Sequence, residues 1–247
     1  MKKIAAIMLI AAMLMSLGSA LAEDYAIATD TAYRPFEYTD ENGELVGIDM
    51  ELLAAVAKDQ GFTYTVEPLG WEASIKACQE GLKDGMIACA SITDERKAAG
   101  WIFSDGYFHA TQSMAIAEGT DIKTFEDLKG HHVSVKSGTL SYDYAASLAE
   151  QYGFTIVTFE TTLEVFMAVA GGQCAACFDD TPILADYVRN GGVFLQMVDG
   201  TANEGTEYGF AVFSTDKQEL VDKFNAGLEN IKASGEYDKI VAKYMSE

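Results

Sequence analysis

The residues with the most evident chemical potential are four cysteines, Cys78, Cys89, Cys174 and Cys177. The last two form a C-x-x-C motif, which is typical of redox and zinc sites. Redox motifs of this kind open a helix, whereas residues 174–178 have the apolar pattern of a buried strand, in which these two thiols would point to opposite faces. The three histidines show no metal-ligand spacing. We therefore predict buried free thiols, with no metal and no cofactor.

A second place of chemical interest lies between a predicted strand that ends at Lys136 and a predicted helix that begins near Ser141. Backbone N–H groups at the start of a helix lack intrahelical acceptors and bind anions readily. Thr139 and Leu140 occupy this position. Elsewhere, Arg96 offers a planar fork of donors that fits a carboxylate. By spacing alone, however, the favoured interpretation is an arginine on a solvated helix face, paired with a neighbouring acid.

Motifs of catalysis and of nucleic-acid binding are missing from the sequence. It contains no G-x-S-x-G elbow, no phosphate-binding loop and no Ser-His-Asp arrangement. Its 38 acidic and 17 basic residues give a formal charge of −21, which disfavours nucleic acid and anionic membrane surfaces, because proteins that bind these cluster lysine and arginine. We predict a protein that is not an enzyme and does not bind nucleic acid.

The pattern of apolar residues predicts an α/β fold, because short apolar strands alternate with amphipathic helices that end at glycines. The expected strands are 25–29, 62–66, 86–90, 132–136, 154–159 and 174–178. The expected helices are 50–58, 72–80, 141–151 and 163–170, with further helices after an N-cap at Thr93 and beginning near Pro182.

An internal sequence similarity indicates two related lobes. Residues 56–63 are similar to residues 148–155, and the next apolar strand follows each copy at a comparable distance and leads into polar residues. Ligand groups in such sheets gather beyond the carboxyl ends of the strands. We expect the chain to cross between the lobes near residues 107–111 and again near residues 206–209.

The first 22 residues have the pattern of a secretory signal peptide. Lys2 and Lys3 precede an apolar run over residues 4–15, and residues 20–22 (ALA) form a cleavage site. The run is too short for a transmembrane helix. We predict cleavage after Ala22, no lipid-anchor cysteine after the apolar run, and a soluble periplasmic mature protein.

Short motifs spread along the predicted mature chain carry a family resemblance. They are residues 28–38 (ATDTAYRPFEY), 47–49 (GID), 91–96 (SITDER) and 103–105 (FSD). Together they resemble the periplasmic polar-amino-acid-binding proteins of ABC transporters, which are the bacterial extracellular solute-binding proteins of family 3. Residues 136–139 (KSGT) and 180–182 (DTP) resemble its glutamine-binding members in particular.

The resemblance implies a two-lobed periplasmic-binding-protein fold with a ligand cleft between the lobes and two hinge strands. Residues 1–22 would be the signal peptide, residues 23–107 and 209–247 the first lobe, and residues 108–208 the second lobe. The cleft would close on one polar amino acid, either glutamine or a basic one. The protein, a monomer, would deliver this ligand to the transmembrane subunits of an ABC permease.

The resemblance also implies which residues hold the ends of the ligand. Arg96, with the Thr139 hydroxyl and the amides near Leu140, would bind the carboxylate. Asp180, helped by Ser91 and by the main-chain carbonyl near Cys89, would bind the ammonium group. The alternative for Asp180 is to stabilise the N-terminal dipole of the following helix, a role that Thr181 can fill as a cap instead.

Aromatic and charged residues would surround the remainder of the ligand. Tyr33 and Trp71 would form walls along its aliphatic carbons, and Asp30, Lys136 and Asp179 would face its side chain. Glutamine-binding members of the family have histidine where this chain has Asp179. This difference leaves arginine, lysine and histidine as alternatives to glutamine.

Two other functions fit the same resemblance. One is an exported enzyme similar to cyclohexadienyl dehydratase, which would need a poised acid or base such as Asp179 or Asp30. The other is a sensor protein that presents its ligand to a receptor. The lack of catalytic motifs favours the binding protein.

Overall fold

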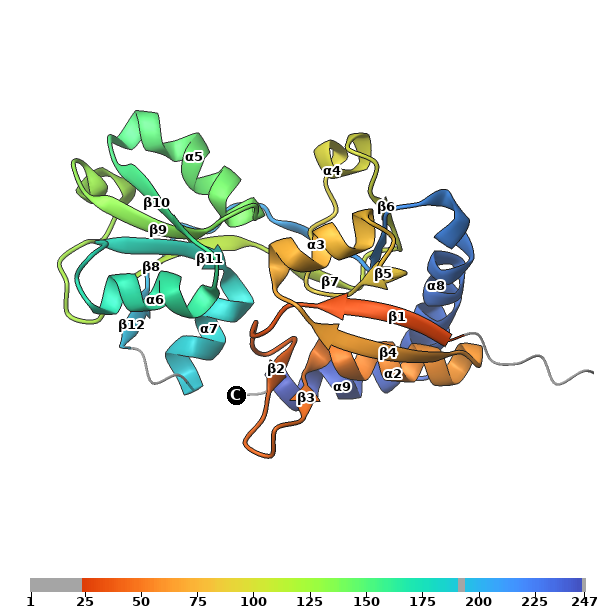
Figure 1. Cartoon of the computed structure of the whole chain (residues 1–247). Coiled ribbons are helices and arrows are strands. Elements are labelled where there is room, and N and C mark those ends of the chain that lie inside the picture. Colours follow the sequence, from red (N-terminus) through yellow and green to blue (C-terminus); the bar gives the residue numbers. More distant parts are fainter. Residues whose placement is uncertain (1–23, 191–193, 246–247) are drawn as a thin grey trace, which may run out of the picture.

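The computed structural model describes residues 24–190 and 194–245, which form two lobes side by side (Figure 1). The predicted signal peptide and its cleavage site lie outside the described residues. Within the described ranges, no helix combines the length and the apolar character that crossing a lipid bilayer requires.

A five-stranded sheet with the order β4-β1-β5-β14-β6 forms the centre of the first lobe. Strands β4 and β5 run parallel to β1, whereas β14 runs antiparallel to β5 and β6. The strands are β1 (Asp24–Thr29), β4 (Thr63–Pro68), β5 (Gly85–Met86), β6 (Ile102–Phe103) and β14 (Ala211–Val212). The helices of this lobe are α2 (Ile48–Gln60), α3 (Trp71–Gln79), α4 (Asp94–Ala98), α8 (Gln218–Ala233) and α9 (Glu236–Met245), with a 3-10 turn η2 (Thr215–Lys217) and a hairpin of β2 (Tyr38–Thr39) and β3 (Leu45–Val46).

The second lobe is built around a five-stranded sheet with the order β10-β9-β11-β8-β12. Strands β10 and β11 run parallel to β9, and β8 runs antiparallel to β11 and β12. The strands are β8 (Gln112–Ala117), β9 (His132–Lys136), β10 (Thr155–Phe159), β11 (Ala176–Asp180) and β12 (Leu195–Met197). Its helices are α5 (Leu140–Tyr152), α6 (Thr162–Ala170), α7 (Thr181–Asn190) and the 3-10 turn η1 (Phe125–Leu128).

The two sheets share one plan, as the internal similarity predicts. Helices α2 and α5 end at Gly61 and Gly153, which both have φ of 71°. Glycine adopts this left-handed conformation without steric cost, and it terminates each helix before the next strand. The strands that follow, β4 and β10, occupy the same edge position in their sheets. The chain therefore uses the same helix-to-strand unit in both lobes.

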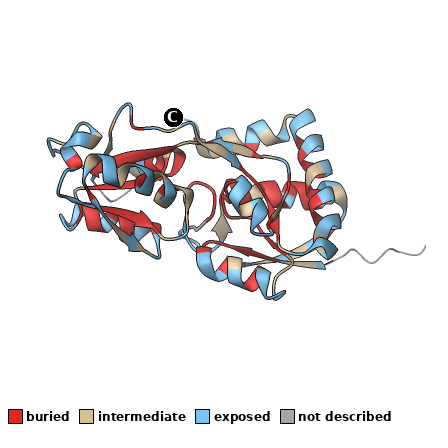
Figure 2. Ribbon diagram, turned by 90° about the horizontal axis from the view of Figure 1, so that it is seen from above, coloured by how far each residue is buried: buried red, intermediate tan, exposed pale blue. Residues whose placement is uncertain are grey.

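Two short strands connect the lobes. Strand β7 (Phe108–Ala110) pairs antiparallel with β13 (Thr206–Tyr208), and Phe108 lies opposite Tyr208. Both strands fall in the segments where the sequence predicts the chain to cross. Figure 2 shows buried residues along the strands and on the helices of both lobes, and one cluster of buried apolar residues includes members of both.

Two predicted strands differ most in their bounds from those in the structure. The expected strand 86–90 consists of Gly85–Met86 alone, and Cys89 has φ of 51°, which is incompatible with a strand. The expected strand 174–178 is Ala176–Asp180, so placing Cys174 in the strand was wrong. An apolar run reports burial but not where backbone pairing stops. The prediction of buried free thiols is confirmed for all four cysteines.

Candidate ligand-binding site

A pocket lined by residues of both lobes lies between them. All but one of the predicted ligand-binding residues line it, and Ala88 joins them. The predicted residues on the pocket wall are Asp30, Tyr33, Trp71, Cys89, Ser91, Arg96, Lys136, Thr139, Leu140 and Asp180. Most of them follow or end the parallel strands β1, β5, β9 and β11, as the rule for ligand groups at carboxyl ends of strands predicts.

Arg96 reaches the pocket from α4, whose N-cap is Thr93 as predicted. Its Nη1 donates to the carbonyl of Ser91 at 2.9 Å, and its Nη2 donates to the carbonyl of Gly138, in the second lobe, at 3.3 Å. The guanidinium also lies over the ring of Trp71, 5.1 Å from the ring centroid. Stacking and carbonyl contacts hold the planar fork in place and leave its other donors for an anion.

Asp180 ends β11 and accepts hydrogen bonds at both oxygens. Its Oδ1 accepts from Gln112 Nε2 at 2.7 Å and from Ser141 Oγ at 3.2 Å, and its Oδ2 accepts from the Tyr208 hydroxyl at 2.5 Å. These three hydrogen bonds fix the position of the Asp180 carboxylate on the pocket wall.

The expected cap of α7 was wrong. The helix begins at Thr181, whose hydroxyl forms hydrogen bonds of 2.6 Å with the hydroxyls of Thr111 and Ser113. Thr181 does not cap the helix because its side chain faces these two residues. Asp180 directly precedes the helix, so its charge lies both at the helix N-terminus and on the pocket wall.

The N-terminus of α5 is the anion-binding candidate in the second lobe. Thr139 is the N-cap, and its hydroxyl accepts from the Tyr142 amide at 3.2 Å and donates to the Lys136 carbonyl at 2.8 Å. In this structure the hydroxyl proton goes to the Lys136 carbonyl, and the contact of Thr139 with a carboxylate stays a prediction. The first amides of the helix, at Leu140 and Ser141, lack intrahelical acceptors and are further candidate donors.

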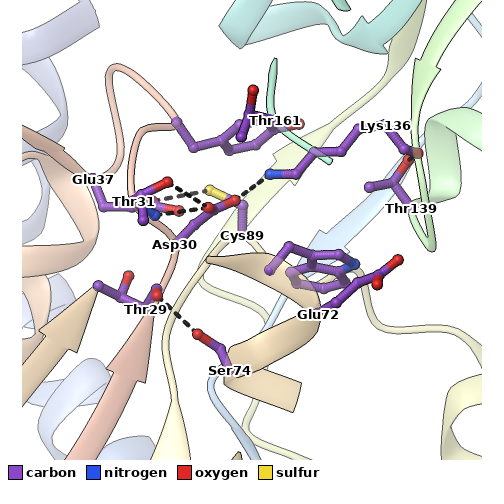
Figure 3. A network of polar contacts seen from close by, with 12 residues as sticks. Thr29, Asp30, Thr31, Glu37, Glu72, Ser74, Cys89, Lys136, Thr139 and Thr161 are labelled. Carbon is purple, nitrogen blue, oxygen red and sulfur yellow. Dashed lines mark hydrogen bonds and ion pairs between the residues drawn. The ribbon is translucent and has the colours of Figure 1, made fainter. Parts of the chain in front are cut away.

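Tyr33 and Trp71 form aromatic walls on the side of the first lobe. Trp71 is the first residue of α3, which is tied to β1 because Ser74 Oγ donates to the Thr29 carbonyl at 2.8 Å (Figure 3). Its indole Nε1 donates to the carbonyl of Gly138 at 2.9 Å. Gly138 has φ of 67°, a left-handed conformation that suits glycine.

Asp30 and Lys136 form a buried ion pair across the pocket. Figure 3 shows the Lys136 ammonium pointing from β9 to the carboxylate of Asp30, which follows β1. The two residues are 4% and 5% exposed, and the other oxygen of Asp30 accepts from the Thr31 amide at 2.7 Å. A buried pair of this kind is stable only while both partners remain, because removing one leaves an uncompensated charge.

Asp179 does not line the pocket, and its predicted contact with the ligand side chain stays a prediction. Adjacent residues of a strand point to opposite faces, and Asp180 takes the pocket side of β11. Asp179 instead accepts from the Tyr33 hydroxyl at 2.6 Å, and its Oδ2 has no partner. Burial, together with the neighbouring charge of Asp180, raises the pKa of Asp179 to about 7.

The sequence analysis did not identify several residues that position the site. Gln112, Ser141 and Tyr208 hold Asp180, and Gly138 accepts from both Arg96 and Trp71. None of these residues carries a charge, and their partners lie far away in the sequence. The only available signal was their place at the ends of predicted elements, such as Tyr208 in the expected second crossover.

Comparisons with known proteins agree with this geometry. The family model for bacterial extracellular solute-binding proteins, family 3, matches residues 25–247. A probable histidine-binding protein of Neisseria gonorrhoeae is 31% identical, covering 90% of this chain and 83% of the relative. The glutamine-binding protein of an ABC transporter of Bacillus subtilis is also 31% identical, covering 90% of this chain and 81% of the relative.

A solved structure of an ancestral arginine-binding protein bound to arginine is 34% identical and superposes with a TM-score of 0.83, covering 92% of this chain and all of that one. This likeness confirms the predicted two-lobed α/β fold. The family model covers all but the first of the described residues, and the pocket lies where the two lobes meet. The chain therefore belongs to the bacterial extracellular solute-binding proteins of family 3.

Proposed function

We propose that this protein binds one free polar amino acid between its lobes and delivers it to an ABC permease in the cell membrane. The pocket supplies a complementary group for each end of a zwitterion, with Arg96 and the N-terminus of α5 for the carboxylate and Asp180 for the ammonium. The relatives are named for binding histidine, glutamine and arginine, which supports an amino acid as the ligand.

The ligand's ends are held by both lobes in this proposal. Arg96 and Ser91 belong to the first lobe, and Asp180 and the amides at Leu140 belong to the second. A ligand that contacts both lobes stabilises the closed form by its differential affinity for that form. We place the lobes at residues 24–107 with 209–245 and at residues 108–208, so that they turn about β7 and β13.

The observation that carries the choice of ligand is the ion pair of Asp30 and Lys136 on the pocket wall. A carboxamide donates two hydrogen bonds through its nitrogen and accepts at its oxygen. Glutamine can therefore donate to Asp30 and accept from Lys136 without adding charge. A guanidinium can bind Asp30 only next to the Lys136 ammonium, and that repulsion opposes it. Glutamine is thus the favoured ligand, ahead of arginine, lysine and histidine.

A thermal-shift screen against the twenty amino acids, cystine and ornithine tests this proposal, because a ligand that binds the folded state raises the melting temperature by mass action. Titration calorimetry then ranks the hits. We expect glutamine to bind most tightly, with one molecule per chain. If no amino acid shifts the melting temperature, the proposed function is wrong, and if arginine binds more tightly than glutamine, only the argument from Lys136 fails.

Delivery to a permease needs a separate measurement. In cells that lack this protein, uptake of labelled glutamine should fall and should return when the wild-type chain is supplied. The Arg96→Ala variant serves as the matched control, because it should be exported but should not restore uptake. Unchanged uptake without the protein would contradict delivery and leave the binding result intact.

A further inference from the structure

A cluster of three buried groups lies directly behind the wall of the ligand pocket and has no part in the proposed function. Glu37 and Asp49 are fully buried, and Cys89 is 5% exposed. The Cys89 sulfur is 3.8 Å from Glu37 Oε2 and 3.9 Å from Asp49 Oδ2 (Figure 3 shows Glu37 and Cys89). One oxygen of each carboxylate and the sulfur all lie within 4.8 Å of one another. Residues 37, 49 and 89 form no recognisable sequence motif, so only folding brings them together.

The two carboxylates lack the partners that buried charges require. Glu37 Oε1 and Asp49 Oδ1 accept no hydrogen bond, and neither carboxylate forms an ion pair with a lysine or arginine among the described residues. Nearby Asp30, in contrast, has its own lysine. A bound cation would remove this imbalance.

Cys89 is also held in an unusual backbone conformation. Its φ of 51° lies in the left-handed region, where the described part of the chain otherwise places only glycines. Such a conformation in a residue other than glycine points to a functional constraint on the side chain. This conformation points the sulfur toward the two carboxylates while the residue still lines the pocket.

The three donors lie close enough together to hold one metal ion after small side-chain shifts. Zinc bonds of about 2.0–2.3 Å imply ligand atoms about 3.3–3.8 Å apart. The sulfur–oxygen separations here are 3.8 and 3.9 Å, and all three donors lie within 4.8 Å of one another. The Tyr107 hydroxyl donates to Asp49 Oδ2 at 2.9 Å, and the Cys89 amide donates to the same oxygen at 3.1 Å, which orients the carboxylate and leaves Oδ1 without a partner. Cys89 also lines the ligand pocket.

We propose that Cys89, Glu37 and Asp49 bind one divalent metal ion of the zinc type behind the amino-acid pocket. The thiol and any protonated carboxyl release their protons to solvent as the metal–sulfur and metal–oxygen bonds form. Zinc is favoured because it accepts one thiolate with two carboxylates in a tetrahedral arrangement, whereas magnesium and calcium require oxygen ligands. The site goes beyond the proposed function and does not depend on it.

The test uses the chelator-treated full mature chain with Co²⁺ as the spectroscopic probe and Zn²⁺ as the competitor, in the absence of any amino acid. We expect a near-ultraviolet thiolate-to-cobalt charge-transfer band that saturates at one Co²⁺ per chain and disappears when Zn²⁺ is added. Cys89→Gly should abolish the band, and glycine suits the left-handed φ, so this variant should fold. Circular dichroism checks its folding.

Two further variants separate a metal site from a merely accessible thiol. Tyr107→Phe removes an orienting hydrogen bond and should weaken Co²⁺ binding about 10-fold while keeping the band. Cys174→Ala removes a buried thiol in the second lobe and should change nothing. The proposal is overturned if the wild-type chain gives no thiolate band, if Cys89→Gly keeps it, or if Cys174→Ala removes it.

Discussion

The carboxylates that line the ligand pocket and those that lie behind it differ in their partners. Asp30 and Asp180 use both oxygens, Asp30 with Lys136 and Thr31, and Asp180 with three side-chain donors. Glu37, Asp49 and Asp179 are equally buried, but one oxygen of each accepts nothing. Burial raises the pKa of all three of these groups.

This difference distinguishes carboxylates whose hydrogen bonds are complete from carboxylates that have one oxygen without a partner. In the pocket, both oxygens of each carboxylate already have donors, so the acids are held in position before a ligand arrives. Behind the pocket, one oxygen of each carboxylate is buried without a donor, which is unfavourable until a proton or a cation satisfies it. The following changes test the two halves of this comparison.

The largest effect should come from Arg96→Ala, which removes the guanidinium that is proposed to bind the ligand carboxylate. Loss of one partner of a buried charge pair weakens binding by about 2–5 kcal/mol, or about 30-fold to 5,000-fold in Kd. Titration calorimetry with glutamine measures this loss. Lys97→Ala, next to it on the exposed face of α4, is the matched control and should bind normally. Near-normal affinity of Arg96→Ala would refute its role.

The next effect concerns ligand choice and should follow from Lys136→Met. Glutamine loses a hydrogen bond from a charged donor, which weakens its binding by about 1.5–3 kcal/mol. For arginine, the substitution removes the ammonium that repels its guanidinium and leaves Asp30 without its ion-pair partner. The affinity for arginine should therefore rise relative to that for glutamine. Calorimetry with both ligands gives the ratio, which a general loss of stability does not alter. Equal losses for both ligands would show that Lys136 does not face the ligand side chain.

A pH effect should come from Asp179, whose pKa burial raises to about 7. From about pH 4, the usual range of an aspartate, up to pH 7 the folded chain holds a proton that the unfolded chain has released. Rising pH therefore lowers the free energy of unfolding, and the loss is complete above pH 7. Urea unfolding at pH 5 and pH 7, with chelator present, should show that Asp179→Asn loses about 2 kcal/mol less than the wild type over this interval. Parallel curves for the two proteins would contradict the raised pKa.

The smallest effect should come from Trp71→Phe, which keeps the aromatic wall but removes the hydrogen bond to Gly138 between the lobes. A neutral hydrogen bond contributes about 1 kcal/mol, so glutamine affinity should fall about fivefold. Calorimetry measures the change. A loss as large as that of Arg96→Ala would mean that the indole, rather than the charges, dominates binding.

Much of the fold could be predicted from the sequence because periodicity and glycines mark the elements. The strand His132–Lys136 begins and ends where the pattern places it, and Gly61 and Gly153 end their helices as expected. The strand after α3 was placed too long because Ile87, Ala88 and Cys89 are buried outside any strand. Apolar composition cannot distinguish these two kinds of burial.

A charged residue at the end of a predicted strand, such as Lys136 or Asp180, could be placed in the candidate site from the sequence, whereas Arg96, inside α4, was assigned through the family resemblance of residues 91–96. The roles of neighbouring residues were harder to foresee. Asp179 and Asp180 look alike in sequence, and strand alternation decides which one faces the pocket. The sequence placed the Thr139 hydroxyl near a ligand but did not show that it also caps α5 and donates to the Lys136 carbonyl. Glu37, Asp49 and Cys89 meet only through folding, which no local pattern reveals.

A crystal structure of the chain grown with glutamine tests the central claim most directly. We predict one glutamine between the lobes, with its carboxylate on Arg96, its ammonium on Asp180 and its carboxamide between Asp30 and Lys136. A structure in which Arg96 and Asp180 both face bulk solvent, with the ligand elsewhere or absent, would contradict the account.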